Sequence, residues 1–356
     1  MSDVPLPDDV VLGRLLDGAL GDGAAGGLAL VVGYDAVCTC AWRPAGQGGE
    51  PAFLAYSVTK AFIAALALAL QEEGRLALDD PLARYVGAFA ERPDVTLRRL
   101  LQHTAGLPDY GGLPEYHAAV RAAPGEPWDD EAFAAHTWQR GLLFEPGTGF
   151  AYSNPGYLLA RRALERAADA SLAELVAARI ARPLGLSRTR VVETTADLRA
   201  LAPGRSCWLA PSGEARDVRD AYHPGWVSHG VVASTASELA RFLHALLAGR
   251  VAGVTRAASL RELTTLVAVP HDVARAPWRE PGYGLGLMAD AASPFGLLFG
   301  HNGGGPGHGA SAFSAPGLRP GGVTACALVG VEEGGVAEGL VRAALARAAP
   351  IGAGDP

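Results

Sequence analysis

The sequence predicts an α/β protein of the α+β type, with one antiparallel sheet built from both chain ends and flanked by helices. Three observations support this: two short apolar runs near the start, several near the end, and helical periodicity between them. We expect residues 1–56 and 205–356 to form a discontinuous sheet-and-helix domain. Residues 57–204 would form a mostly helical inserted subdomain, with the functional site between the two parts. The alternative is two sequential domains.

The composition indicates a globular protein and excludes several function classes. The chain has 356 residues, 49% of them hydrophobic and 19% charged, which is enough apolar surface for a large core. A net charge of -7 gives no basic footprint for nucleic acid. The longest apolar run, Ala61–Leu70, is about half of the roughly 20 residues that a membrane span needs. We therefore expect neither a nucleic-acid nor a membrane partner.

The cysteines and the N-terminus favour a cytoplasmic protein. The first 20 residues have no basic segment followed by an apolar stretch and a small-residue cleavage site, so they do not resemble a secretory signal. They predict an amphipathic helix instead. The four cysteines are expected to be reduced core residues; they are Cys38, Cys40, Cys207 and Cys326.

The elements can be expected in the following order. After the first helix, Leu28–Gly33 and Ala36–Trp42 predict a β-hairpin, followed by a Gly/Pro-rich stretch up to Pro51. From Ser57 to about Leu201 the helical period dominates, interrupted by the stop signals EEG, APGEP and FEPGTG. The middle of the chain is therefore expected to be helix and loop.

The last third returns to short strands. Thr235–Leu247 predicts a helix, and Thr235 with Glu238 has the spacing of a capping box. Four apolar runs separated by Gly/Pro turns then predict strands, and a closing helix follows. The runs are Tyr283–Met288, Phe295–Gly300, Gly309–Ser314 and Gly322–Val331, and the helix is Gly334–Ala349.

Lys60 is the only lysine in the chain, and it follows Ser57 by three residues. If a helix begins near Ser57, the two side chains lie on one face within hydrogen-bond reach. The residues that follow, AFIAALALAL, are apolar on all sides, so the helix is expected to be buried. Burial and the positive helix end lower the pKa of the lysine towards values at which it can accept a proton. Arginine cannot be deprotonated in this way, which explains one lysine among arginines; the alternative is codon bias.

Two further motifs carry polar groups in turn-rich surroundings. Tyr152 and Asn154 flank Ser153 in EPGTGFAYSNPGY; a phenol can relay a proton, and an amide can hold a carbonyl or the lysine. The alternative is an Asn-Pro turn with a packed tyrosine. His301 belongs to GHNGGGPGHG, a glycine-rich stretch after a predicted strand, where glycines permit close backbone approach. We expect His301 to face a cleft; otherwise this is a turn with a surface histidine.

Taken together, the motifs resemble the serine beta-lactamase and penicillin-binding protein family, in its branch of class C beta-lactamases, DD-peptidases, esterases and transacylases. Ser57 to Lys60 matches S-x-x-K, Tyr152 to Asn154 matches Y-x-N, and His301 to Gly303 matches H-x-G. The resemblance covers nearly the whole chain. It extends to LLQHTAGLPDY at 100–110, PGTGFAYSNPGYLLA at 146–160, GVVASTASELARFLHALL at 230–247 and YGLGLM at 283–288.

The resemblance implies a role for each matching residue. Ser57 would be the acylated nucleophile, Lys60 its base, Tyr152 a proton shuttle and Asn154 a substrate contact. The backbone amides of Ser57 and Gly304 would form the oxyanion hole. Secreted class C beta-lactamases carry K-T/S-G at the third box, where this chain has His301, Asn302 and Gly303. A fixed positive charge for a substrate carboxylate is therefore lost or made pH-dependent. The resemblance then disfavours efficient beta-lactam hydrolysis and favours esterases, D-amino-acid amidases, DD-peptidases or acyltransferases.

Several other polar and aromatic residues are candidates for the site or for purely structural roles. His103 and His308 are expected to be structural or to line the cleft, and four large rings are candidates for an acyl pocket. These are Trp226, His229, Tyr110 and Trp128. GDGAAG at 21–26 precedes a predicted strand instead of following one, so it fails as a dinucleotide site. Neither a cofactor nor a metal is expected.

The function expected from these observations is that of a serine ester or amide hydrolase acting on a small molecule. A transacylase that passes the acyl group to an amine or alcohol acceptor would use the same residues. A DD-peptidase or beta-lactamase, and a non-catalytic binding module, are the remaining alternatives. The sequence alone does not indicate an oligomeric state.

Overall fold

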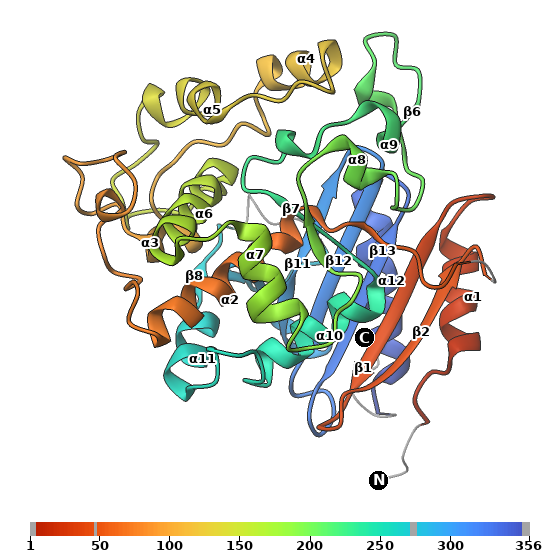
Figure 1. Cartoon of the computed structure of the whole chain (residues 1–356). Coiled ribbons are helices and arrows are strands. Elements are labelled where there is room, and N and C mark those ends of the chain that lie inside the picture. The colour runs from red at the N-terminus through yellow and green to blue at the C-terminus, as the bar shows by residue number, and fades with distance from the viewer. Residues whose placement is uncertain (1–4, 46–47, 271–275, 351–356) are drawn as a thin grey trace.

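The computed structural model describes residues 5–45, 48–270 and 276–350, and it confirms the predicted fold class (Figure 1). Strands from both chain ends lie side by side in one antiparallel sheet, with the order β2-β1-β13-β12-β11-β10-β9-β8. The strands are β1 (Gly26–Val32), β2 (Val37–Arg43), β8 (Val267–Ala268), β9 (Pro281–Tyr283), β10 (Met288–Ser293), β11 (Gly296–Gly305), β12 (His308–Ala315) and β13 (Val323–Val329).

The two chain ends meet at β1 and β13. These strands pair over seven positions, from Gly26 opposite Val329 to Val32 opposite Val323. Every residue of both strands is buried. In β1, Leu28 and Leu30 pack in one core with α1 (Asp9–Ala19) and α12 (Gly334–Ala348), while alternate residues face the core around α10 (Ala236–Leu247). Both faces of the sheet are covered, which explains why β1 is apolar without alternation.

The middle of the chain consists of helices joined by loops and carries the short elements. α2 (Thr59–Glu72) is buried on all sides from Thr59 to Leu70, as predicted. The other helices are α3 (Leu97–Leu101), α4 (Pro114–Ala122), α5 (Asp130–His136), α6 (Asn154–Ala168), α7 (Leu172–Val176), α8 (Thr195–Leu198), α9 (Val218–Ala221) and α11 (Ala257–Thr264). Two small sheets join β3 (Phe53–Leu54), β7 (Val231–Ser234) and β4 (Arg190–Val192), and β5 (Arg205–Ser206) with β6 (Arg216–Asp217).

The predicted strand Tyr283–Met288 is wrong: it is the turn between β9 and β10. Gly284 donates its N–H to the Leu287 carbonyl at 2.8 Å. Gly286 has φ +64° and lies so close to α2 that an added Cβ would come within 2.4 Å of the Lys60 carbonyl oxygen. Leu285 and Leu287 are fully buried. The apolar character of this run therefore comes from packing against α2 and not from strand pairing.

Other expectations are corrected in detail. The glycine-rich stretch 300–309 is mostly strand, because β11 runs to Gly305 and the turn is confined to Pro306 and Gly307. Thr235 caps α10 through the Glu238 N–H at 3.3 Å, but the Glu238 carboxylate turns away to the Arg188 N–H at 3.0 Å, so the reciprocal half of the capping box is absent. Cys207 is exposed and is not a core residue.

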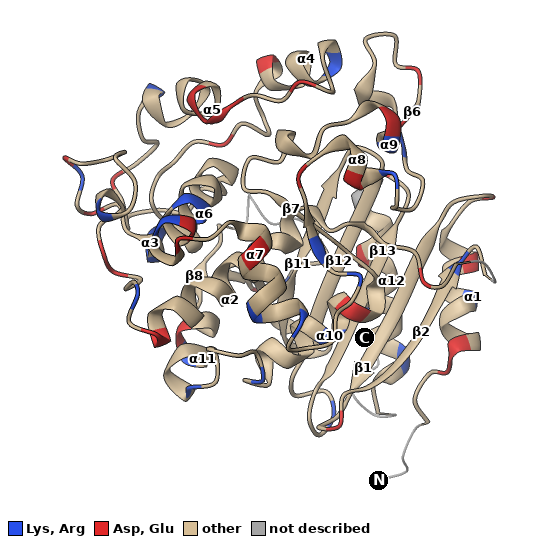
Figure 2. Cartoon of the chain, viewed as in Figure 1, with Lys and Arg blue, Asp and Glu red and all other residues tan. Residues whose placement is uncertain are grey.

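Charged residues lie apart from the centre of the sheet. Figure 2 shows acidic and basic residues interspersed over the helices and loops, and β11 to β13 carry none. In the described part of the chain, no helix is both long enough and apolar enough to cross a bilayer. The division into a domain of residues 1–56 with 205–356 and a subdomain of residues 57–204 stays a prediction.

Candidate active site

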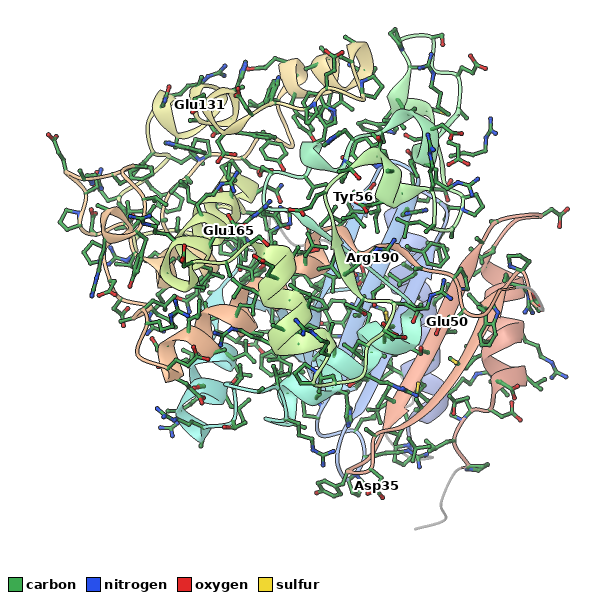
Figure 3. The ribbon with its side chains drawn as sticks, in the orientation of Figure 1. Asp35, Glu50, Tyr56, Glu131, Glu165 and Arg190 are labelled. Carbon is green, nitrogen blue, oxygen red and sulfur yellow. The ribbon has the colours of Figure 1, made fainter. Side chains whose placement is uncertain are left out.

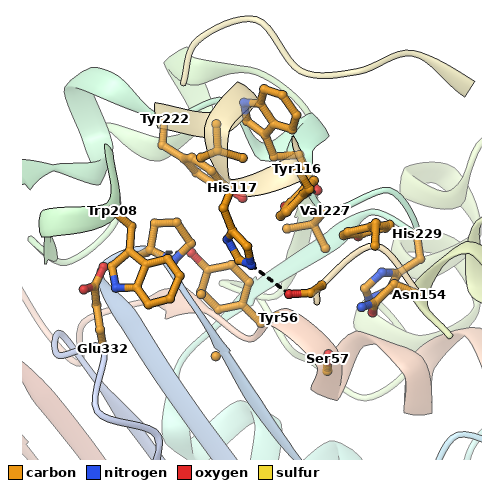
Figure 4. Close-up of a pocket in the computed structure, with 17 residues that line it drawn as sticks. Tyr56, Ser57, Tyr116, His117, Asn154, Trp208, Tyr222, Val227, His229 and Glu332 are labelled. Carbon is orange, nitrogen blue, oxygen red and sulfur yellow. Dashed lines mark hydrogen bonds between the residues drawn. The ribbon is translucent and has the colours of Figure 1, made fainter. Parts of the chain in front are cut away.

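A cavity of about 330 Å³ opens beside Ser57. Six aromatic side chains form much of its wall: Tyr56, Tyr110, Tyr116, Trp208, Tyr222 and Trp226. Figure 4 shows Ser57, Asn154 and His229 at one end and Glu332 with Trp208 at the other. Tyr110, Trp226 and His229 line the cavity as expected. Trp128 does not line it and packs against the Trp226 ring instead, with a centroid distance of 5.9 Å.

Ser57 sits in a tight turn before α2 that β11 supports. Tyr56, which precedes it, has φ +45°, and its hydroxyl donates to the Pro306 carbonyl at 2.6 Å. Tyr56 is labelled in Figure 3. An added Cβ at Gly303 would lie 2.3 Å from the Ala55 carbonyl oxygen, and one at Gly305 would lie 2.4 Å from the Tyr56 ring. The glycines of β11 thus let the strand backbone press against the turn that carries Ser57.

Lys60 is fully buried and lies in the first turn of α2, directed at Ser57. Its Nζ is 3.1 Å from Ser57 Oγ, 2.7 Å from Asn154 Oδ1 and 3.3 Å from His229 Nε2. Burial lowers the pKa of Lys60 to about 7, against the opposing effect of the Asp109 carboxylate. A substantial share of this amine is therefore neutral near neutral pH, as the sequence predicts.

Tyr152 approaches Ser57 as a second hydrogen-bond partner. Its hydroxyl donates to Ser57 Oγ at 2.9 Å, and its ring lies 4.8 Å from Lys60 Nζ. Burial raises the pKa of Tyr152 well above 10, although the hydrogen bond with Ser57 lowers it in part. Tyr152 is therefore a phenol near neutral pH and can donate a proton, whereas Lys60 can accept one.

Asn154 is held by a carboxylate that the sequence analysis missed. The Asn154 N–H donates to Asp109 Oδ1 at 2.8 Å, and its Nδ2 donates to Asp109 Oδ2 at 3.4 Å. The amide oxygen is consequently left to face Lys60. Burial raises the pKa of Asp109, while hydrogen bonds from Asn154 and the nearby Lys60 charge oppose this. In the sequence, Asp109 is marked only by its place in the stretch LPDY. A residue that orients another through a contact across the fold has no fixed spacing from it in the sequence.

His103 and His308 hold segments of the backbone in place, in line with the structural role expected from the sequence. His103 has φ +59°, and its Nδ1 accepts the Ser153 N–H at 3.0 Å, which ties down the loop between Tyr152 and Asn154. His308 accepts the Leu54 N–H at 3.1 Å and donates to the Ala202 carbonyl at 3.0 Å.

His301 does not face the cavity, contrary to the sequence expectation. It is 2% exposed; its Nε2 lies 2.9 Å from the Tyr283 hydroxyl, and its Nδ1 contacts the Asn302 carbonyl. Burial lowers the pKa of His301 to about 3, with the Lys60 charge adding to the effect. Gly303, the last residue of the third box, packs against Ala55, and the following Gly304 lines the cavity.

A family model and several known proteins match this chain. The family model described as Beta-lactamase matches residues 14–345. A penicillin-binding protein of Bacillus subtilis strain 168 is 32% identical over 213 residues, which cover 53% of this chain and 44% of that protein. Esterase EstB of Burkholderia gladioli is 33% identical over 141 residues, or 36% of each chain. The matched regions thus span less than half the length of these curated relatives.

Solved structures match over nearly the full length. A D-stereospecific amidohydrolase from Streptomyces sp. is 28% identical, with a TM-score of 0.76 over 97% of this chain and 99% of its own. The D-amino acid amidase of Ochrobactrum anthropi, with a TM-score of 0.77, covers 94% of this chain and 97% of its own; at 22% identity it supports the fold alone. With the family model matched over most of its length, the chain belongs to the Beta-lactamase family.

Proposed function

We propose that this protein is a serine hydrolase that acts on a small-molecule ester or amide through an acyl-enzyme. The observation that carries the proposal is the position of Ser57 Oγ, 3.1 Å from the buried amine of Lys60 and 2.9 Å from the phenol of Tyr152. In this proposal Ser57 is the nucleophile, Lys60 the base and Tyr152 the proton shuttle.

Acylation would proceed as follows. The neutral Lys60 amine takes the Ser57 proton while Oγ forms a bond to the substrate carbonyl carbon. The amides of Ser57 and Gly304 stabilise the negative charge on the carbonyl oxygen. Tyr152 protonates the leaving alcohol or amine as its bond to carbon breaks, and the proton held by Lys60 restores the phenol. Water then attacks the acyl group by the reverse sequence of proton transfers and releases the acid.

The charges of the cavity support esters and amides over substrates that present a carboxylate. Among the described residues that line the cavity there is no arginine or lysine, and Glu332 contributes a carboxylate. His301 has a pKa of about 3 and therefore carries no positive charge near neutral pH. The carboxylate of a DD-peptide or penicillin would find no arginine or lysine among the described residues of this wall. The names of the esterase relative and of the amidohydrolase at 28% identity support the same substrate class.

The test is a panel of activated esters followed by intact-protein mass spectrometry. We expect a covalent acyl adduct on Ser57, with turnover, and no adduct in Ser57→Ala. A fluorophosphonate is expected to label Ser57, whereas benzylpenicillin is expected to label it slowly or not at all. Failure of both the esters and the fluorophosphonate to modify the wild-type protein would favour a binding module that kept the fold.

The acyl acceptor is decided by a second measurement. In the proposed hydrolase, water takes the acyl group, and adding amines or alcohols leaves the acid as the main product. A transacylase would instead give acceptor-dependent product with slow hydrolysis. Chromatography of the products formed from one activated ester, with and without each acceptor, distinguishes the two.

A further inference from the structure

His229 contacts Lys60, and none of the three sequence motifs contains it. It is 1% exposed, lines the cavity, and places its Nε2 3.3 Å from Lys60 Nζ. Its Nδ1 is buried and has no hydrogen-bond partner in the part of the chain that the structure describes. The contact with Lys60 is thus the hydrogen bond that this imidazole makes.

The backbone on both sides of His229 is tied to the site. The Ser228 N–H donates to the Tyr110 hydroxyl at 3.2 Å, and the Val232 N–H donates to Thr59 Oγ1 at 2.9 Å. Gly230, with φ +83°, closes the turn through a 2.8 Å bond from its N–H to the Val227 carbonyl. Because Thr59 precedes Lys60 in α2, the turn that carries His229 is anchored directly to the helix that carries the lysine.

The hydrogen-bonding groups of the neutral Lys60 amine determine the role of its contact with His229. Such an amine has two N–H donors and one lone pair, and Lys60 has three neighbours within hydrogen-bond reach. Asn154 presents its amide oxygen, which only accepts. If His229 Nε2 also accepts, both N–H groups are used, and the lone pair is left for the Ser57 hydroxyl.

We propose that His229 is a positioning residue that, together with Asn154, holds both N–H groups of the neutral Lys60 so that its lone pair faces Ser57. This inference rests on the proposed acyl-enzyme function. The required tautomer carries its proton on Nδ1. It also fits the protonated lysine, whose three N–H groups then point to Asn154, His229 and the Ser57 oxygen. In the opposite tautomer, the Nε2–H group would donate to the lone pair of the neutral Lys60, and it would point an N–H group at the N–H groups of the protonated Lys60.

Burial, more than the neighbouring charges, keeps His229 neutral in this role. Burial lowers its pKa well below 6.5, and the Lys60 charge, His301, Arg161 and His103 add to the effect. Asp109 is the acidic group that acts on Lys60. No proton passes to the imidazole in the proposed step: the Ser57 proton moves to Lys60 and from there to the Tyr152 oxygen, once Tyr152 has protonated the leaving group.

Three substitutions test the proposal. His229→Leu removes the acceptor while filling much the same volume. His229→Gln keeps an amide oxygen at about the depth of Nε2, whereas His229→Asn places its amide at about the depth of Nδ1, short of Lys60. His244→Leu is the matched control, because His244 is a buried histidine of α10 bonded to Thr324 and the Gly33 carbonyl, away from the cavity.

The readout is kcat and KM for an uncharged activated ester between pH 5 and 9, per active site titrated with a fluorophosphonate. For His229→Leu and His229→Asn we expect kcat to fall about tenfold or more with KM within about twofold. An acceptor hydrogen bond favours the charged amine, so its loss moves the acidic limb of the rate profile to lower pH in the Leu variant. His229→Gln should restore most of kcat and the wild-type limb.

Two results would overturn the proposal. One is a Leu variant with wild-type kcat and an unmoved acidic limb. The other is a Gln variant as impaired as the Leu variant, since then the acceptor is not what matters. If the Leu variant does not fold, the Gln and Asn pair gives the same comparison. Wild-type protein that no fluorophosphonate or ester labels would instead count against the proposed function itself.

Discussion

Lys60 combines complete burial with a hydroxyl partner, and this combination defines the chemistry open to Ser57. An ammonium at this position lacks most of its hydration, so the neutral amine gains relative to it. Burial raises the pKa of the neighbouring Tyr152 phenol, so this group keeps its proton near neutral pH. The pair therefore divides into one proton acceptor and one proton donor on either side of the same oxygen atom.

The first prediction at this scale concerns the identity of the base. Lys60→Arg should lower kcat for an activated ester by about 10²-fold or more, because a guanidinium keeps its proton and cannot take one from Ser57. Circular dichroism and the thermal midpoint of the variant report whether it folds. An active, folded Lys60→Arg protein would rule out Lys60 as the base.

The second prediction concerns pH. Lys60, with a pKa of about 7, is protonated and inactive as a base below that pH and neutral above it. With an uncharged ester, kcat/KM should rise about tenfold per pH unit below pH 7 and level off above it. Tyr152 keeps its proton throughout, so no alkaline fall is expected up to pH 9. A rate that is flat from pH 5 upwards would contradict this assignment.

Sequence reasoning reached the residues of the three motifs, named His229 only as a candidate for an acyl pocket and missed Asp109. Ser57 and Lys60 are three apart on one helix start, so their contact follows from local geometry. Asp109 and His229 meet Asn154 and Lys60 only after distant segments pack together. His301 was expected to face the cleft, but Tyr283, which comes from the β9–β10 region, binds its imidazole.

At the scale of elements, β11 and the turn before α2 form one unit. Gly303 and Gly305 of the strand contact the turn, and Gly304 and Gly305 line the cavity. Their number in the sequence predicted close backbone approach but not that they lie within a strand. Helix α2 was predictable because an all-apolar segment must be buried. The β9–β10 turn was not predictable, because leucines that alternate with glycines give the same sequence pattern in a buried turn as in a strand.

The prediction for this unit compares adjacent glycines. Gly303→Ala should destabilise the protein by about 1–3 kcal/mol, because its Cβ would meet the Ala55 carbonyl oxygen, and should also displace Ser57 and reduce kcat. Gly304→Ala is the control for stability, since no heavy atom lies within 4 Å of its added Cβ. Thermal unfolding and ester turnover measure both. Equal stability of the two variants would show that β11 does not support the turn as described.

At the scale of the whole molecule, the first and last strands complete one sheet. β1 lies between β2 and β13, so this side of the sheet cannot form until both chain ends are present. The sequence predicted this closure from apolar runs at each end. It could not give the strand order, because pairing between residues some 300 positions apart leaves no local pattern.

The corresponding prediction is that a chain lacking residues 1–45 will not fold. Loss of residues 1–45 would leave β13 with an unpaired edge over seven positions and expose the apolar surface that α1 and β1 cover. We expect the truncated protein in the insoluble fraction, unlabelled by a fluorophosphonate. Full-length Ser57→Ala is the control for solubility. Soluble, labelled truncated protein would show that the terminal strands are dispensable.

The single lysine has a practical consequence. An endoprotease specific for lysine finds one peptide bond to cut in this chain, between Lys60 and Ala61, and in the native state that bond is enclosed within α2. Cleavage into two fragments therefore counts the molecules that have opened far enough to expose α2. The rate of that single cut, followed on a gel, would measure global opening without any probe attached to the protein.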